Sequence, residues 1–123
     1  MYIYKAGVVG AGAMGAEIAQ TITFSGIPVV LKDVDRAMVD KGLSTIRKIY
    51  QRRVDRGKMS QEDMEQKMAL VAGTTTYELF RDADLVIEAV PEKLDLKQRI
   101  FRELDAAVPA SAILASDTSS LSI

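Results

Sequence analysis

Three glycines near the N-terminus have the types and spacing of a phosphate-binding loop. Gly10, Gly12 and Gly15 follow an apolar run that ends at Val9. Gly10 permits a tight turn, Gly12 lets a phosphate approach the main chain, and Gly15 allows the next helix to pack closely. A helix that begins here presents unpaired N–H groups and a partial positive charge, which suit a pyrophosphate. The pattern predicts a dinucleotide-binding loop made of Gly10, Ala11, Gly12, Ala13, Met14 and Gly15.

A carboxylate stands where this fingerprint requires one. Asp33 follows a second apolar run, Val29–Leu31, and lies 18 residues after Gly15. Its carboxylate can accept both ribose hydroxyls, and at about 4 Å it would repel a 2′-phosphate by on the order of 4 kcal/mol near a surface. The sequence therefore favours NAD over NADP as the cofactor. Arg36 is the counter-argument, because an arginine can receive the 2′-phosphate.

Length and composition restrict the class of protein. The chain has 123 residues, 48% hydrophobic and 27% charged, with a net charge of −1. These values are typical of one globular domain that attracts neither nucleic acid nor anionic membrane. Histidine and cysteine are both absent, so nitrogen–sulfur metal sites are excluded and no metal is expected. We expect a cytoplasmic protein, because no signal peptide or membrane-spanning run is evident.

Alternating strand and helix signals predict an α/β fold of the Rossmann type, a doubly wound parallel sheet with the first strand in the centre. The expected strands are residues 2–9, 29–32, 70–74, 85–90 and 112–115. Met14, Ile18 and Ile22 recur at helical spacing and mark one face of the first helix. Asp35 and Ser60 are expected to cap the next two helices, and a fourth spans residues 94–108.

Three further groups of polar residues have two interpretations each. Glu92 and Lys97 follow the fourth strand, and on their types alone a charged pair at a helix start is favoured over a ligand contact. The hydroxyls of residues 116–120 suit a ligand or a helix cap equally well. The basic run over residues 47–58 is a solvated helix face, or alternatively a docking surface for a phosphate-bearing substrate.

Five motifs together resemble the L-3-hydroxyacyl-CoA dehydrogenase family, above all the dehydrogenase part of multifunctional fatty-acid oxidation enzymes. The motifs are Gly10–Gly15, Val30–Asp33, Arg56–Ser60, Val86–Glu92 with Lys97, and Ala115–Leu121. The resemblance implies oxidation of L-3-hydroxyacyl-CoA to 3-ketoacyl-CoA in fatty-acid β-oxidation, with hydride transfer to NAD.

The resemblance also assigns individual residues. It implies cofactor contacts for Glu92 and Lys97, which overturns the helix-start interpretation of that pair, and a position beside nicotinamide and substrate for Ser119. The basic helix, with Arg47 and Arg53, matches the region that receives the CoA part of the acyl-CoA substrate. Asp117 departs from the family, which usually has Asn there.

The same resemblance implies that the chain is a piece of a longer enzyme. We expect residues 1–123 to be one NAD-binding domain, truncated after about the fifth strand. The catalytic His–Glu pair and the helical C-terminal substrate and dimerisation domain are expected beyond it. Two alternatives stay open: another β-hydroxyacid dehydrogenase, or a non-catalytic dinucleotide-binding module.

The fifth expected strand, residues 112–115, would form an edge of this sheet. It is apolar and carries no charge before Asp117, and such an edge is a template for pairing with another chain. We therefore expect self-association through this edge or through residues 116–123. The competing outcome is a monomer in which those last residues cover the edge.

The 123-residue chain on its own should not turn over substrate. It contains no histidine, so the commonest general base is not available to take the hydroxyl proton. The measurement is NADH formation with a 3-hydroxyacyl-CoA. Turnover at the rate of ordinary dehydrogenases would contradict this expectation.

Overall fold

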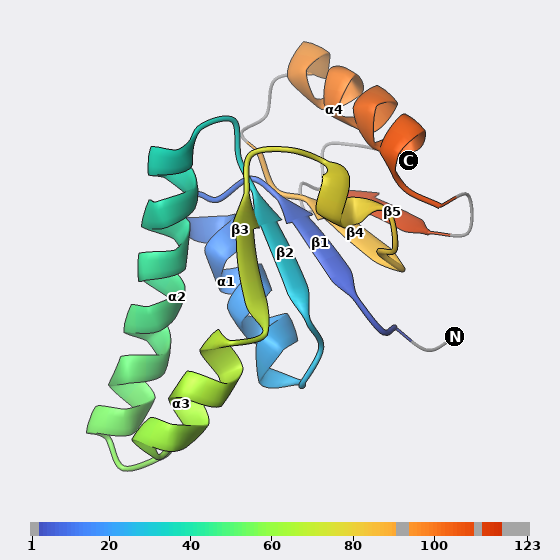
Figure 1. Cartoon of the computed structure of the whole chain (residues 1–123). Helices are drawn as coiled ribbons and strands as arrows, with labels where there is room; N and C mark the ends of the chain where they lie inside the picture. Colours follow the sequence, from blue (N-terminus) through green and yellow to red (C-terminus); the bar gives the residue numbers. More distant parts are fainter. Residues whose placement is uncertain (1–2, 91–93, 110–111, 117–123) are drawn as a thin grey trace.

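The computed structural model describes residues 3–90, 94–109 and 112–116 (Figure 1). Strands and helices alternate along the chain. In order they are β1 (Ala6–Val9), α1 (Ala13–Phe24), β2 (Val29–Lys32), α2 (Arg36–Asp55), α3 (Gln61–Met68), β3 (Val71–Thr74), the 3-10 helix η1 (Glu78–Phe80), β4 (Leu85–Glu88), α4 (Leu94–Ala107) and β5 (Ile113–Ser116).

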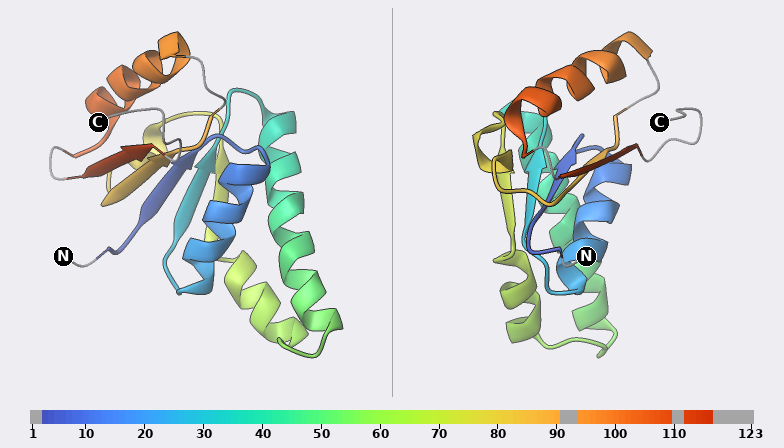
Figure 2. Two further views of the ribbon diagram at one scale, coloured as in Figure 1. Left: turned by 180° about the vertical axis from the view of Figure 1, so that it is seen from behind. Right: turned by 90° about the vertical axis from the view of Figure 1, so that its right-hand side faces the viewer.

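The five strands form one parallel sheet in the order β3-β2-β1-β4-β5. The first strand is central, as predicted, and the crossover helices lie on both faces, as in a doubly wound sheet. Figure 2 shows α1 and α2 on one face, η1 on the other, and α4 near the carboxyl ends of the strands. Among the described helices, none is long and apolar enough to cross a membrane.

The third and fifth strands differ from the prediction by no more than one residue at either boundary, whereas the start of the first strand and the end of the fourth differ further, because side chains take backbone hydrogen bonds that a strand ladder would otherwise use. The first strand was expected from Tyr2, but the N–H groups of Tyr4 and Lys5 donate to Oδ2 of Asp84, at 2.8 and 3.1 Å. At the end of β4, the N–H of Val90 donates to Oε2 of Glu88 at 2.6 Å. The ladder of these two strands is therefore shorter than the apolar runs that predict them.

The predicted helix caps are present. Oδ1 of Asp35 accepts from the N–H of Met38 at 2.8 Å, and Oγ of Ser60 accepts from the N–H of Asp63 at 3.0 Å. Each cap satisfies one of the N–H groups that a helix start leaves unpaired. These two bonds therefore help to set where α2 and α3 begin.

The predicted face of α1 is wrong at Met14. This side chain is 48% exposed, and the buried positions of α1 are instead Gly15, Ala16, Ala19, Gln20 and Thr23. The reason is space, because a Cβ on Gly15 would collide with the carbonyl oxygen of Gly10. Small residues let α1 lie directly against the sheet, and this close packing leaves Met14 at the rim.

The core on the first face contains a buried hydrogen-bonded group. The hydroxyls of Tyr50 and Thr23 lie 2.7 Å apart, and the Tyr50 hydroxyl donates to the carbonyl of Gln20 at 3.1 Å. Burial raises the pKa of Tyr50 above its ordinary value, although its hydrogen bonds act in the opposite direction. These bonds join α2 to α1 inside an otherwise apolar core.

On the second face, the ring of Phe80 is fully buried against the central strand. A Cβ on Gly7 would collide with this ring. Only glycine at this position of β1 therefore leaves room for Phe80. The aromatic contact continues outward, since the Tyr77 and Phe80 ring centroids lie 5.6 Å apart, edge to face. The sheet thereby fixes Tyr77 close to the carboxyl ends of the strands.

Candidate functional site

The glycine loop makes a tight turn between β1 and α1. Gly10 has a φ of 111°, which strongly favours glycine, and its N–H donates to the carbonyl of Lys32 at 2.7 Å. Gly12 is the N-cap of α1 and has no side chain to bond the free N–H groups of the first turn. A Cβ on Gly12 would meet nothing within 4 Å. The start of α1 is thus open to a ligand, which is what an anion site requires.

Asp33 joins the end of β2 to this loop. Its Oδ2 accepts from the N–H of Ala11 at 2.8 Å, and its Oδ1 accepts from the N–H of Val34 at 2.6 Å. A carboxylate has about four acceptor positions, so both oxygens keep capacity for further donors. The sequence predicted Asp33 only as a ligand contact, and its bond to the loop was missed.

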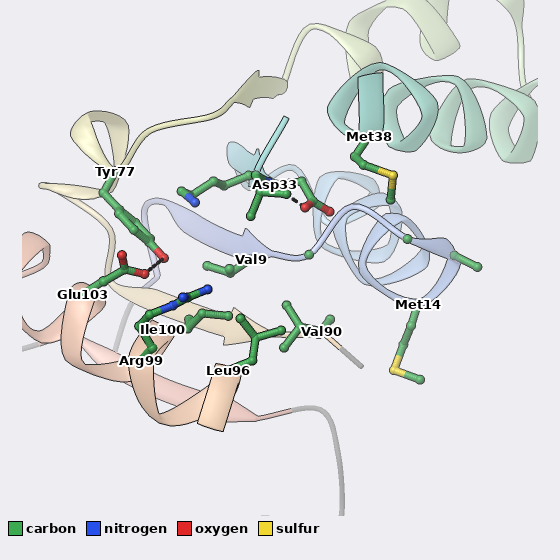
Figure 3. Close-up of a pocket in the computed structure, with 16 residues that line it drawn as sticks. Val9, Met14, Asp33, Met38, Tyr77, Val90, Leu96, Arg99, Ile100 and Glu103 are labelled. Carbon is green, nitrogen blue, oxygen red and sulfur yellow. Dashed lines mark hydrogen bonds between the residues drawn. The ribbon is translucent and has the colours of Figure 1, made fainter. Parts of the chain in front are cut away.

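A cavity of about 630 Å³ lies at the carboxyl ends of the strands, between the glycine loop and α4 (Figure 3). Its lining comes from the sheet, the loop, the start of α2, the segment before η1 and α4. These residues are Val9, Gly10, Gly12, Ala13, Met14, Lys32, Asp33, Val34, Met38, Tyr77, Ala89, Val90, Leu96, Arg99, Ile100 and Glu103.

One end of the cavity is polar. The Nζ of Lys32, a residue that is 7% exposed, lies 4.2 Å from the centre of the Tyr77 ring, within cation–π range. The Tyr77 hydroxyl donates to Oε1 of Glu103 at 3.3 Å. Burial first, and then the adjacent Glu103 carboxylate, raises the pKa of Tyr77 well above its ordinary value. Tyr77 is therefore a neutral donor across the physiological pH range.

Five of the predicted site residues line this cavity together: Gly10, Gly12, Ala13, Met14 and Asp33. Ala11 is buried beneath it and bonds Asp33, while Gly15 packs against Gly10.

The remaining predicted cofactor contacts have no described side chain. Glu92, Asp117 and Ser119 lie outside the described residues, and of Lys97 only the backbone is described, within α4.

The two arginines predicted to contact CoA lie on other surfaces. Arg47 forms a salt bridge with Glu65 of α3 at 2.7 Å, and the guanidinium of Arg53 lies 4.5 Å from the ring centre of Phe24. Neither lines the cavity. Within the described part of the chain, no cluster of His, Cys, Asp or Glu side chains could hold a metal ion.

Arg36, which could have received the 2′-phosphate of NADP, is turned toward β3. Its Nη1 donates to the carbonyl of Gly73 at 3.2 Å, and its Nε lies 3.0 Å from Oδ1 of Asp40. Two acceptors therefore already hold the guanidinium that a 2′-phosphate would need.

Sequence reasoning missed the part of the cavity that α4 and its surroundings supply. A signal existed for α4, because Leu96, Ile100 and Glu103 are spaced four and three residues apart and so share one helix face. Val34 gave a second signal, because it is an apolar residue directly after Asp33. In the structure its side chain is 73% exposed. For Tyr77 the sequence held no comparable signal, because contacts with residues distant in the sequence, Lys32 and Glu103, and the packing of Phe80 against Gly7 determine its position.

Comparison with known proteins identifies the family. The sequence profile described as "3-hydroxyacyl-CoA dehydrogenase, NAD binding domain" matches residues 5–123. The chain belongs to this family. The match confirms the predicted resemblance and the predicted cofactor, NAD.

Relatives of known sequence support the same assignment. The chain is 43% identical over 121 residues to the "Peroxisomal fatty acid beta-oxidation multifunctional protein MFP2" of Arabidopsis thaliana, covering 98% of the chain and 17% of that protein. It is 37% identical to the "Fatty acid oxidation complex subunit alpha" of Psychrobacter arcticus, with the same two coverages. The chain therefore spans about a sixth of the length of these relatives.

Solved structures have the same fold. The "(S)-3-hydroxybutyryl-CoA dehydrogenase PaaH1 from Ralstonia eutropha" superposes with a TM-score of 0.95 at 38% identity, over 99% of this chain and 43% of that one. A 3-hydroxybutyryl-CoA dehydrogenase from Escherichia coli K12 superposes with a TM-score of 0.94 at 32% identity, over 100% of this chain and 26% of that one. The Rossmann-type fold predicted from the sequence is confirmed.

Two glycines of the loop should respond to alanine in opposite ways. Gly12→Ala should weaken NAD binding by roughly 1–3 kcal/mol, the scale of a methyl group forced into a close-packed site, because the added methyl group would enter the open space that the cofactor is expected to fill. Its free energy of unfolding should change by less than about 1 kcal/mol. Gly15→Ala should lower the free energy of unfolding by roughly 1–3 kcal/mol or more.

Calorimetry with NAD and urea unfolding of the same two variants separate these effects. The interpretation of the loop fails if Gly12→Ala binds NAD as well as the unsubstituted chain does.

Proposed function

We propose that this cavity holds the adenosine half of NAD, and that the whole protein oxidises L-3-hydroxyacyl-CoA to 3-ketoacyl-CoA. The observation that carries the proposal is the open helix start at Gly12 beside the carboxylate of Asp33. These two features suit a pyrophosphate and a ribose in adjacent positions. When bound, NAD supplies the hydride acceptor for the oxidation.

In this proposal the residues of the chain bind and orient the cofactor. The N–H groups at the start of α1 face the pyrophosphate, and Asp33 accepts from the ribose hydroxyls while it keeps its bond to Ala11. The base then occupies the remaining cavity, between the exposed side chain of Val34 and the α4 residues Leu96 and Ile100. Such apolar walls suit a flat aromatic ring.

The family resemblance supplies the remaining roles. Glu92 and Lys97 are proposed to contact the cofactor, and Ser119 to lie on the side of nicotinamide and substrate. Arg47 and Arg53 are proposed to receive the CoA moiety of the acyl-CoA substrate, in which case they must release Glu65 and Phe24. A cytoplasmic location also stays a proposal, since the related plant proteins are named peroxisomal or glyoxysomal.

The chain should prefer NAD to NADP through Asp33. Asp33→Ala should cost on the order of 1.5–3 kcal/mol in NAD binding, the scale of a hydrogen bond to a charged group. Asp33→Asn keeps an oxygen for the Ala11 N–H but loses the charge that repels a 2′-phosphate. The difference between the affinities for NAD and NADP should therefore be smaller in this variant. Asp55→Asn, an exposed change on α2, is the control and should leave both affinities unaltered.

Calorimetric titration with both cofactors measures the preference. Equal affinity of the unsubstituted chain for NAD and NADP would refute the role of Asp33.

We also propose that the chain self-associates through β5. Within the described sheet β5 pairs only with β4, and Ile113 is 41% exposed. The opposite edge differs, because Arg36 donates to the carbonyl of Gly73 on β3 and places a charge there. An apolar edge without charge favours pairing with another chain, whereas a charged one opposes it.

Ile113→Lys should therefore lower the average mass seen by light scattering at high protein concentration. Leu79→Lys is the matched control, because Leu79 is similarly exposed, at 43%, and lies on η1 rather than on β5. A monomeric mass at every concentration in the unsubstituted chain would rule out self-association.

A further inference from the structure

The polar end of the cavity lies where the base of the dinucleotide must end. Met14 beside the glycine loop and the Tyr77–Glu103 pair lie at opposite ends of the cavity, with Asp33 between them (Figure 3), so a base held beyond the ribose extends toward the pair. Val9, Leu96 and Ile100 give the cavity apolar walls, and its polar or charged lining residues besides Asp33 are Lys32, Tyr77, Arg99 and Glu103. Apolar walls bind any purine, whereas polar groups at the end distinguish one purine edge from another.

The hydrogen bonds at this end leave an acceptor for the base. The Tyr77 hydroxyl donates to Oε1 of Glu103, which fixes the carboxylate of an otherwise exposed α4 side chain. An ionised carboxylate accepts only, and one such bond does not exhaust its two oxygens. The ammonium of Lys32 lies over the Tyr77 ring, and this contact in turn holds the ring.

We infer that the Tyr77–Glu103 pair reads the edge of the base and selects a purine with a 6-amino group. The inference rests on the proposed function, that the cavity holds the adenosine half of NAD. A 6-amino group donates to the Glu103 carboxylate, whereas the 6-oxo group of hypoxanthine turns an acceptor toward it. Glu103 is the specificity-determining residue, and Tyr77 is a positioning residue that acts through it.

The test compares NAD with nicotinamide hypoxanthine dinucleotide, which differs from NAD only in this part of the base. Dissociation constants of the 123-residue chain are measured for both by calorimetry. A hydrogen bond to a charged group corresponds to roughly a tenfold to hundredfold difference in affinity. Because Glu103 is exposed, we expect the lower end, about tenfold in favour of NAD.

Three variants assign the preference to the pair. Glu103→Gln offers an amide donor as well as an acceptor, so the ratio of the two dissociation constants should fall to about one. Tyr77→Phe keeps the ring over Lys32 but frees Glu103, so it should give an intermediate ratio. Asp105→Asn changes an exposed carboxylate of the same helix that does not line the cavity, and it should keep the full ratio.

A purely structural role for the pair would change both dissociation constants together and leave their ratio unaltered. The inference is overturned if the unsubstituted chain binds both dinucleotides equally, or if Glu103→Gln keeps the full ratio. Either result leaves the proposed function standing, because NAD still binds. If neither dinucleotide binds, the proposed function fails and the inference fails with it.

Discussion

The structure of the site depends on the two hydrogen bonds that the Asp33 carboxylate accepts. One comes from Ala11 in the glycine loop and the other from Val34 at the start of the next segment. The end of β2 and the turn after β1 are therefore held in one geometry before any ligand arrives. A ligand that needs both the helix start and the carboxylate meets a prepared arrangement, so less of its binding free energy is lost in ordering the protein.

Much of the fold could be predicted because it depends on local signals. The glycine spacing, the caps at Asp35 and Ser60 and the apolar run of β4 each act over a few residues, and each led to the correct element. The error at the start of β1 came from a distant side chain. Asp84 takes the N–H groups of Tyr4 and Lys5 from the ladder, and no pattern within residues 2–9 could indicate a partner nearly eighty residues away.

The sequence predicted the cavity residues of the glycine loop and Asp33, but not the lining residues Leu96, Arg99, Ile100 and Glu103 of α4. Gly12 and Asp33 belong to a fingerprint whose spacing has a chemical reason, so the sequence was sufficient to predict that they lie in one place. Tyr77 and Glu103 meet because the segment at η1 and the helix α4 pack on the same face of the sheet. Their contact is a property of tertiary structure, and their spacing along the chain does not reveal it.

At four glycines, a larger side chain would disturb the packing of the sheet against its neighbouring helices. A methyl group on Gly7, Gly15, Gly42 or Gly73 would press into Phe80, Gly10, Ala11 or Val39 respectively. Most protein cores fail through cavities, when a large side chain is trimmed. These four positions already carry glycine, the smallest residue. Any substitution there can only add volume to the packed contact. A larger residue at Gly7 or Gly73 can be accommodated by a smaller neighbour, whereas at Gly15 and Gly42 the nearest atom is a backbone carbonyl oxygen, so the helix itself must move outward.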